Sequence, residues 1–475
     1  MASPGPTVMA VIDAARAALQ YPASLAYPPG TITALLADVV ARFADKPAYT
    51  CMGHTLTYGD LDRLSQQFAA YLQHHTDLEP GDRIAIQLPN VLQYPVVVYG
   101  ALRAGLVVVN TNPLYTPREM EHQFSDAGAK AVVILANMAH KLEEVLSQTP
   151  VRHVIITELA DLHPPLRRLF INSAAKYLKK MVPPYSLPRA LSLRWALARG
   201  AESHFTPVTR TPEDIAVLQY TGGTTGVAKG AMLTHANLLA NMRQCEVFMH
   251  KAGIAEAHET AVAPLPLYHI YAFMLHCLLL PLSGNHSLLI PNPRDIPAFV
   301  ATLAKQPFTV FVGINTLFVA LLNDLRFRAL DFSRLKLTLS GGMALTESAA
   351  RHWQEATGCA VLEGYGLTEA SPVLTINPPG HARVGTIGIP MPDTAIRITD
   401  DNGFELPPGE AGELCARGPQ VMKGYWQRAE ATRETIIDGW LHTGDIAVVD
   451  ADGYIRIVDR KKDMIIVSGF NVYPN

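Results

Sequence analysis

The chain has 475 residues, of which 49% are hydrophobic and 17% charged, so it is long enough for several domains of roughly 100–200 residues, each with its own core. Its 39 basic and 42 acidic residues give a formal net charge of −3, which lacks the basic excess typical of nucleic-acid-binding proteins. Its five cysteines form no Cys-x-x-Cys pair, which argues against a zinc motif and predicts a reducing compartment, with the cytoplasm as the default.

Strand-like runs alternate with helical patterns through the first 380 residues. We predict strands at 83–89, 104–112, 129–135, 308–313, 335–342 and 359–366. Such alternation is typical of parallel sheets covered by helices. The predicted fold class is therefore α/β, with two parallel-type α/β subdomains at about 1–200 and 201–380.

After about residue 380 the pattern changes to strand, turn and strand. Asn402-Gly403, Asp438-Gly439 and Asp452-Gly453 are hairpin signals. We expect 381–459 to form a β-rich, antiparallel and barrel-like subdomain.

Two earlier segments depart from these patterns. The run 260–293 contains no Asp, Glu, Lys or Arg, but its prolines and histidines argue against a membrane span, so we expect a buried helix beside an apolar cavity. The segment 164–184 predicts a basic amphipathic helix. Two interpretations of it stay open: it lies on an anionic membrane, or it packs its apolar stripe on the core.

The stretch YTGGTTGVAKG, residues 220–230, combines glycines, threonine hydroxyls and one lysine. It does not have the Walker A spacing, because Lys229 follows Gly226 by three residues and Gly230 stands where Ser or Thr is needed. A strand at 215–220 precedes it, and a helix begins near Thr234 or His235. Backbone N–H groups in such a turn can surround a polyphosphate, whereas the alternative is a merely flexible loop.

Three further stretches are rich in functional side chains. GYGLTEASP (364–372) places an aromatic ring, a hydroxyl and a carboxylate close together, which suits adenine stacking, a phosphate hydrogen bond and a Mg²⁺ ligand. GWLHTGD (439–445) ends in a carboxylate that can accept from ribose hydroxyls. DRKKDMIIVSGFNVYPN (459–475) begins with five charged residues.

Together, these four stretches resemble the signature motifs of the adenylate-forming, AMP-dependent synthetase and ligase family, and most of all its bacterial long-chain fatty acid–CoA ligases. The resemblance implies ATP-dependent activation of a fatty acid to acyl-AMP with release of pyrophosphate, then thioester formation with coenzyme A. It implies ATP, Mg²⁺ and coenzyme A as cofactors or co-substrates, and no nucleic acid. The expected location is the cytoplasm, with a peripheral position on the inner face of the membrane if 164–184 makes the membrane contact that its pattern leaves open.

The resemblance also assigns the site residues. It gives the β- and γ-phosphates to Thr221, Gly222, Gly223, Thr224, Thr225, Gly226 and Lys229. Thr368 would bond the α-phosphate, and Glu369 would hold Mg²⁺. Tyr365, followed by Gly366, would stack on adenine. Asp445 would bind the ribose, and Arg460 would reach the ribose or a phosphate. His269 would lie beside the substrate carboxylate, and Gly341 and Gly342 would line the site and leave room for an acyl chain. The catalytic set is His269, Thr368, Glu369 and Lys229.

In this family a hinge near residue 460 leads into a C-terminal domain, and Lys462 matches the pivot. Because the chain ends at Asn475, we expect 460–475 to be the hinge and the start of a truncated domain, and we expect nucleotide and acyl-adenylate binding without full turnover. Two alternatives stay open: an acyl-AMP ligase that serves a carrier protein, and a non-catalytic acyl-adenylate-binding fragment.

Overall fold

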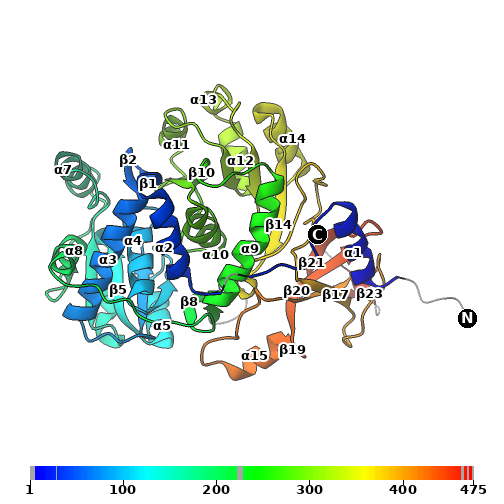
Figure 1. Ribbon diagram of the computed structural model, residues 1–475, viewed down its shortest axis with the longest axis horizontal. Helices are drawn as coiled ribbons and strands as arrows, with labels where there is room; N and C mark the ends of the chain where they lie inside the picture. Colours follow the sequence, from blue (N-terminus) through cyan, green and yellow to red (C-terminus); the bar gives the residue numbers. More distant parts are fainter. Residues whose placement is uncertain (1–5, 28, 222–227, 462–464, 468–469, 473–475) are drawn as a thin grey trace, which may run out of the picture. The chain divides into compact units, whose positions relative to one another are not determined.

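The computed structural model describes residues 6–27, 29–221, 228–461, 465–467 and 470–472, with side chains up to Lys461 (Figure 1). The chain divides into two compact units, and each is described by itself. Unit 1 takes in the described parts of Met1–Pro28, Asn237–Ala255 and Leu303–Asn475, and unit 2 takes in those of Pro29–Ala236 and Glu256–Thr302. The sequence-based division at about 200 and 380 stays a prediction.

Unit 2 contains a seven-stranded sheet. Its strands, in spatial order, are β7 (Leu191–Ser192), β6 (His153–Thr157), β5 (Ala129–Leu135), β3 (Arg83–Gln87), β4 (Val107–Asn110), β8 (Ile215–Tyr220) and β9 (Gly230–Thr234). All neighbours are parallel except β8 and β9, which pair antiparallel. The predicted strands at 83–89, 104–112 and 129–135 are confirmed.

Unit 2 also contains helical segments. They are α2 (Ile32–Phe43), α3 (Tyr58–His75), α4 (Gln93–Arg103), α5 (Pro117–Ala127), η1 (Ala136–Met138), α6 (Ala139–Val145), η2 (Leu146–Gln148), α7 (Pro165–Ser173), η3 (Ala174–Leu178) and α8 (Leu193–Ala201). Capping boxes begin α3 at Thr57 and α5 at Thr116. Every residue of α4 is buried, and α3 packs against both α4 and α8, as Figure 1 shows. A side chain on Gly100 would lie 2.7 Å from the ring of Phe68, so glycine lets α3 and α4 approach closely.

The uncharged run 260–293 gives unit 2 two strands with helical turns between them. Its elements are β10 (Thr260–Ala263), α10 (Ile270–Phe273), η4 (Met274–Leu279), η5 (Pro281–Ser283) and β11 (His286–Leu289), and α11 (Ile296–Leu303) follows. β11 pairs in parallel with both β10 and β1 (Pro47–Cys51), and β1 forms a hairpin with β2 (His54–Thr57). The expected buried helix is thus confirmed only for its middle, where the α10 and η4 side chains are buried, and the ends of the run are buried strands.

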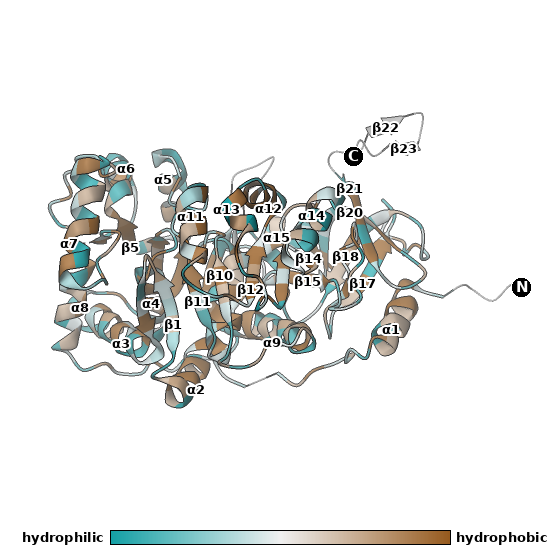
Figure 2. Cartoon of the chain, turned by 90° about the horizontal axis from the view of Figure 1, so that it is seen from above, coloured by the Kyte–Doolittle hydropathy of each residue, from teal (hydrophilic) through white to brown (hydrophobic). Residues whose placement is uncertain are grey.

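Unit 1 contains a second α/β layer. Strands β12 (Val310–Gly313), β13 (Leu337–Ser340) and β14 (Val361–Gly366) run parallel, and β15 (Val373–Ile376) and β16 (Ile389–Pro390) continue the sheet antiparallel. The helical elements of this part are α9 (His235–Lys251), α12 (Asn315–Leu322), α13 (Leu325–Arg328), α14 (Glu347–Thr357) and η6 (Thr368–Ala370). Trp353 of α14 is fully buried against the rings of Phe311 and Phe318, at centroid distances of 4.9 and 4.7 Å. In Figure 2 the strands are mainly brown, as expected for buried strands.

The predicted antiparallel pairing after residue 380 is confirmed. It consists of β17 (Ala395–Thr399), β18 (Gly412–Arg417), β20 (Trp440–Val449), β19 (Ile436–Ile437) and β21 (Ile455–Arg460), with α15 (Ala429–Thr435) before β19 and a small pair β22 (Ile465–Val467) and β23 (Phe470–Val472) after β21. Gly403, Gly439 and Gly453 all have positive φ, as the hairpin signals require. The described strands β17–β21 form an open sheet, so the barrel-like shape expected from the sequence is wrong.

Helix α1 (Val8–Ala18) packs on this antiparallel sheet. Val8 and Ile12 join a buried cluster with Ile396 and Leu414. The buried guanidinium of Arg16 donates to the carbonyl oxygens of Met391, at 2.6 Å, and Thr394, at 2.8 Å.

Among the described residues, no helix has the length and apolar character needed to cross a bilayer. All five cysteines are buried and free. They are Cys51, Cys245, Cys277, Cys359 and Cys415.

Candidate active site

The predicted phosphate loop lies between two antiparallel strands of unit 2. Thr221 donates its backbone N–H to the carbonyl oxygen of Lys229 at 3.0 Å, and Tyr220 pairs with Gly230 at the facing ends of β8 and β9. A side chain on Gly230 would meet the Tyr220 ring at 3.0 Å, which explains glycine where Walker A has a hydroxyl residue. The helix predicted to begin near Thr234 or His235 is confirmed, because α9 begins at His235, and the strand β9, which was not predicted, lies between the loop and this helix.

Thr221 and Lys229 are half-buried at the two ends of this loop. The predicted phosphate ligands Gly222, Gly223, Thr224, Thr225 and Gly226 lie outside the described residues. Their assignment therefore stays a prediction.

His269 is the N-cap residue of α10. Its Nδ1 accepts from the backbone N–H of Tyr271 at 3.3 Å, so Nδ1 carries no proton. The imidazole is exposed to solvent yet closely surrounded by protein atoms, and this desolvation lowers its pKa. A neutral imidazole beside an anionic substrate would position it without adding charge.

In unit 1, the structure brings Tyr365, Asp445 and Arg460 together. Tyr365 is the penultimate residue of β14 and donates its hydroxyl to Asp445 Oδ2 at 2.5 Å. Asp445 and Arg460 face each other across β20 and β21, and their side chains form an ion pair at 3.6 Å. Burial, and then the negative charge of Asp445, raise the pKa of the Tyr365 hydroxyl well above its ordinary value, so it stays a hydrogen-bond donor.

Glu369 lies in η6, one residue after Thr368. Its Oε1 accepts from the hydroxyl of Tyr425 at 2.6 Å, and its backbone oxygen accepts from Met422 N at 2.7 Å. Burial, and then the carboxylate, raise the pKa of Tyr425. The sequence analysis missed Tyr425, which is 56 residues from Glu369, although the run MKGYWQ that follows β18 was a signal for it.

Three glycines shape this part of unit 1. Gly342 follows β13 with φ of +79°, and among the described residues other than its two chain neighbours no heavy atom lies within 4 Å of the place where a side chain would begin. Gly341 before it is buried. At Gly366 a side chain would come within 2.0 Å of the Pro372 carbonyl oxygen, so only glycine fits next to Tyr365. Lys462, the predicted pivot, lies outside the described residues.

The side chains of unit 1 fit a nucleotide with its metal ion. The half-buried carboxylate of Asp445 matches a diol, since each of its oxygens can accept from one hydroxyl. The half-buried Glu369 offers a hard oxygen ligand next to the hydroxyl of Thr368, which is the donor type that Mg²⁺ prefers.

Comparison with known proteins agrees with this chemistry. Residues 36–426 match the family described as AMP-binding enzyme. The chain belongs to the AMP-binding enzyme family. It is 54% identical over 437 residues to the long-chain-fatty-acid–CoA ligase of Escherichia coli O6:H1, a match that covers 92% of this chain and 78% of that protein.

Solved structures of the same type superpose over most of the chain. A long-chain-fatty-acid-CoA ligase from Archaeoglobus fulgidus matches with a TM-score of 0.78 and 25% identity, over 92% of this chain and 86% of that one. ATP-bound MatB from Rhodopseudomonas palustris matches with a TM-score of 0.74 and 29% identity, over 94% and 82%. The predicted α/β fold is confirmed by these matches.

Proposed function

We propose that the chain is an AMP-forming acid–thiol ligase that activates long-chain fatty acids. The observation that carries this proposal is the 54% identity to a long-chain-fatty-acid–CoA ligase over 92% of the chain. The grouping of Tyr365, Asp445 and Arg460 in unit 1 supports it, because an aromatic ring, a diol acceptor and a cation suit a nucleotide.

The reaction has two steps. A carboxylate oxygen of the fatty acid attacks the α-phosphorus of ATP, and the bond to pyrophosphate breaks. The thiolate of coenzyme A then attacks the acyl carbon, and AMP leaves. Bound Mg²⁺ would supply charge neutralisation at the phosphates.

The chain's own residues would hold the reactants. Asp445 and Arg460 orient the ribose, and Tyr365 stacks on the base. Thr368 donates to the α-phosphate, and Glu369 holds the metal ion. In unit 2 the loop 221–229 binds the β- and γ-phosphates through its N–H groups, hydroxyls and Lys229, and the neutral imidazole of His269 lies beside the substrate carboxylate. Gly341, Gly342 and Gly366 leave room for the nucleotide and the acyl chain, and Lys462 is the pivot of the hinge.

The test is a calorimetric titration of the chain with non-hydrolysable acyl-adenylate analogues of increasing acyl-chain length. Each pair of added methylenes should tighten binding by up to about 1.6 kcal/mol until the chain is fully buried. Asp445→Asn should weaken every analogue, and Glu410→Asn, an exposed acid of the same sheet region, is the control. Affinity that does not change with chain length would refute the fatty-acid assignment, and no binding of any analogue would refute the proposed site in this chain.

We also propose that unit 2 touches a membrane through helix α7 and η3. No α7 side chain is buried. The exposed fractions of the large apolar residues reach 85% for Leu166, 75% for Phe170 and 80% for Leu178. The sequence left open whether this stripe packs on the core, and the exposure of these side chains supports the membrane contact (Figure 2 shows α7 with brown and teal turns).

Polar contacts attach α7 to unit 2 while its apolar side chains stay outside. Arg167 donates to the carbonyl oxygens of Met52 and Gly53, and Asn172 donates to Asp161 at 3.2 Å. The segment 164–184 carries five basic residues and no acidic one, so its charge complements an anionic lipid surface.

Vesicle sedimentation tests this contact. Binding to vesicles with anionic lipid should exceed binding to neutral vesicles and weaken with salt. Leu169→Gln combined with Phe170→Gln should reduce it about tenfold, since two inserted side chains are lost. Leu325→Gln, at an exposed leucine of unit 1, is the control. Unchanged vesicle binding by the double variant would overturn the membrane assignment. So would a wild-type chain that dimerises without lipid and a double variant that does not, because the apolar face would then be a contact between two copies of the chain.

A further inference from the structure

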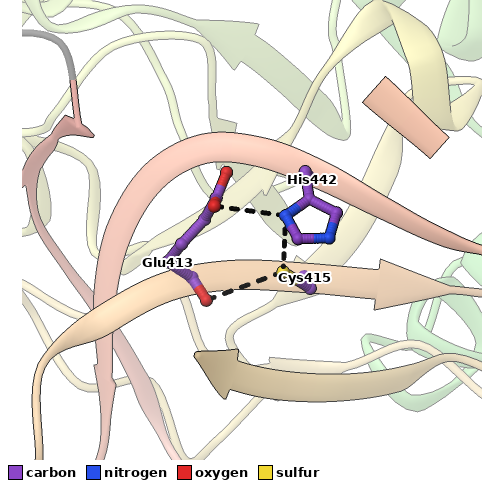
Figure 3. Close-up of side chains that lie close together, drawn as sticks. All are labelled: Glu413, Cys415 and His442. Carbon is purple, nitrogen blue, oxygen red and sulfur yellow. Dashed lines mark hydrogen bonds and ion pairs between the residues drawn. The ribbon is translucent and has the colours of Figure 1, made fainter. Parts of the chain in front are cut away.

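A buried carboxylate next to the proposed ribose site connects two functional segments. Glu413 of β18 has only 9% of its side chain exposed. Its Oε1 accepts from the backbone N–H of Gly444 at 3.1 Å. Its Oε2 accepts from His442 Nδ1 at 3.1 Å and from Lys461 Nζ at 3.0 Å. Figure 3 shows Glu413 and His442 pointing toward one another from the facing strands β18 and β20.

The contact with Gly444 fixes an irregularity in β20. Glu413 pairs with Ile446 and Cys415 pairs with His442, so three residues of β20, 443–445, face the single Leu414. Such a bulge re-aims a side chain, and here it carries Asp445. Gly444 has φ of +74°, which suits its place at the turn of the bulge. The Glu413 side chain and the Leu414 carbonyl, which accepts from Thr443 Oγ1 at 2.7 Å, both hold the bulge in place.

The contact with Lys461 reaches the segment expected to act as the hinge. Lys461 follows Arg460 at the end of β21, and Lys462 is next in the chain. Burial would raise the pKa of Glu413, but hydrogen bonds from His442 and Lys461 outweigh it and hold that pKa below its ordinary value. The carboxylate is therefore charged at neutral pH, and the ion pair with Lys461 is complete.

We propose that Glu413 is a positioning residue that couples the ribose-binding bulge to the hinge. One carboxylate oxygen sets the position of Asp445 through Gly444, and the other holds Lys461. A movement of the chain after Arg460 that pulls Lys461 away changes the charge balance on the carboxylate that fixes the bulge. This inference rests on the proposed function in two respects, namely that Asp445 binds the ribose and that the segment after Arg460 is the hinge.

A metal ion is the competing explanation, because Glu413, Cys415 and His442 offer one ligand atom each within 4.8 Å of one another. Two observations argue against it. Both oxygens of Glu413 already accept hydrogen bonds, and the ammonium of Lys461 lies 3.0 Å from the oxygen that the metal would use. Coordination by His442 Nδ1 would also force the proton onto Nε2, which is buried without a hydrogen-bond partner among the described residues.

The experiment compares AMP with 2′-deoxy-AMP in calorimetric titrations of the whole chain. Glu413→Gln should weaken AMP binding about tenfold and 2′-deoxy-AMP binding much less, because only AMP presents the second hydroxyl to Asp445. A general folding defect would weaken both nucleotides equally and would overturn the proposal. Glu410→Gln, the same exchange at an exposed position, is the matched control.

A double-mutant cycle with Lys461→Met tests the coupling. If the Glu413–Lys461 ion pair carries the coupling, the loss of AMP affinity in the double variant should differ by about fivefold from the product of the losses in the two single variants. Additive effects would overturn the coupling. Lys461 is partly exposed, so its variant should fold even where Glu413→Gln does not.

Two further readouts separate this proposal from the proposed function. Hydrogen exchange at the Gly444 amide should accelerate in Glu413→Gln without any ligand, since that amide loses its charged acceptor. A wild-type chain that binds no AMP refutes the proposed function, whereas the Gly444 exchange still tests the positioning role. The positioning role is refuted if hydrogen exchange at the Gly444 amide is unchanged in Glu413→Gln. It is also refuted if a zinc chelator lowers the AMP affinity of the wild-type chain, because Glu413 would then be a metal ligand.

Discussion

Four buried histidines should make unit 2 sensitive to mild acid. His163, His235, His276 and His286 are each at least 95% buried. Burial lowers the pKa of His276 to about 3 and that of the other three to about 4. Two of the four rings have no acceptor for an added proton: His235 Nδ1 accepts from the Ile32 N–H, and His276 Nε2 has no partner among the described residues.

The magnitude follows from linkage. Unfolded histidines bind a proton near pH 6.5, whereas these four stay neutral in the folded unit until about pH 4. Their stabilising contribution is complete above about pH 6.5 and is lost as the pH falls toward 4. Between about pH 7.5 and 5.5 each histidine should lower the free energy of unfolding by about 1.3 kcal/mol, or about 5 kcal/mol together. That is a large part of the 5–15 kcal/mol or so that typical domains have.

Urea unfolding at the two pH values is the assay, with hydrogen exchange in the peptides of β3 and β5 reporting on unit 2. The chosen window lies above the ordinary titration range of Asp and Glu, so carboxylates contribute little. His276→Gln should reduce the slope of the free energy of unfolding against pH by the equivalent of about one proton. His74→Gln, at an exposed position, controls for the substitution itself. If the free energy of unfolding falls by less than about 1 kcal/mol between about pH 7.5 and 5.5, the four histidines do not have the lowered pKa values on which the prediction depends.

Three substitutions test the packing that supports the site. Trp353→Ala should destabilise unit 1 by about 3–5 kcal/mol in urea unfolding, because it empties an aromatic cluster and removes the 3.0 Å hydrogen bond to Thr338. Gly200→Ala should cost about 1–3 kcal/mol and open the contact of α8 with α3, since its side chain would lie 1.7 Å from the Gln67 carbonyl oxygen; full stability of the variant would contradict this. Arg16→Met should cost about 2–4 kcal/mol by leaving buried carbonyl oxygens without their donor, and hydrogen exchange should then show α1 detaching first.

The sequence predicted the strands well where local signals were strong. The strands at 129–135 and 215–220 are confirmed residue for residue or nearly so, and the three hairpin glycines have the positive φ that their turns require. The run AMLT after the phosphate loop is too short to show a period, so β9 was not predicted. Periodicity also identified the apolar face of α7, but it carries no information about what, if anything, covers that face.

The candidate site was predictable as a set of residues and not as a set of contacts. Motifs assigned Tyr365, Glu369 and Asp445 to the proposed nucleotide site, and the structure joins Tyr365 to Asp445 across 80 positions of the chain. The partners Tyr425 and Glu413 carry no motif that the sequence analysis used. Their roles depend on strand pairing and on a bulge, which only the tertiary structure determines.

The polar groups proposed to bind ATP are hydrogen-bonded to one another in this structure. Tyr365 donates to Asp445, Arg460 forms an ion pair with the same carboxylate, and Tyr425 donates to Glu369. Half-buried carboxylates would destabilise unit 1 if they had no donors, because desolvation of an unpaired charge is costly. Nucleotide binding therefore has to exchange these internal contacts for contacts with the ribose and the metal ion. Selectivity follows from that exchange, since a ligand that lacks a hydroxyl or a cation leaves a half-buried carboxylate without its replacement partner.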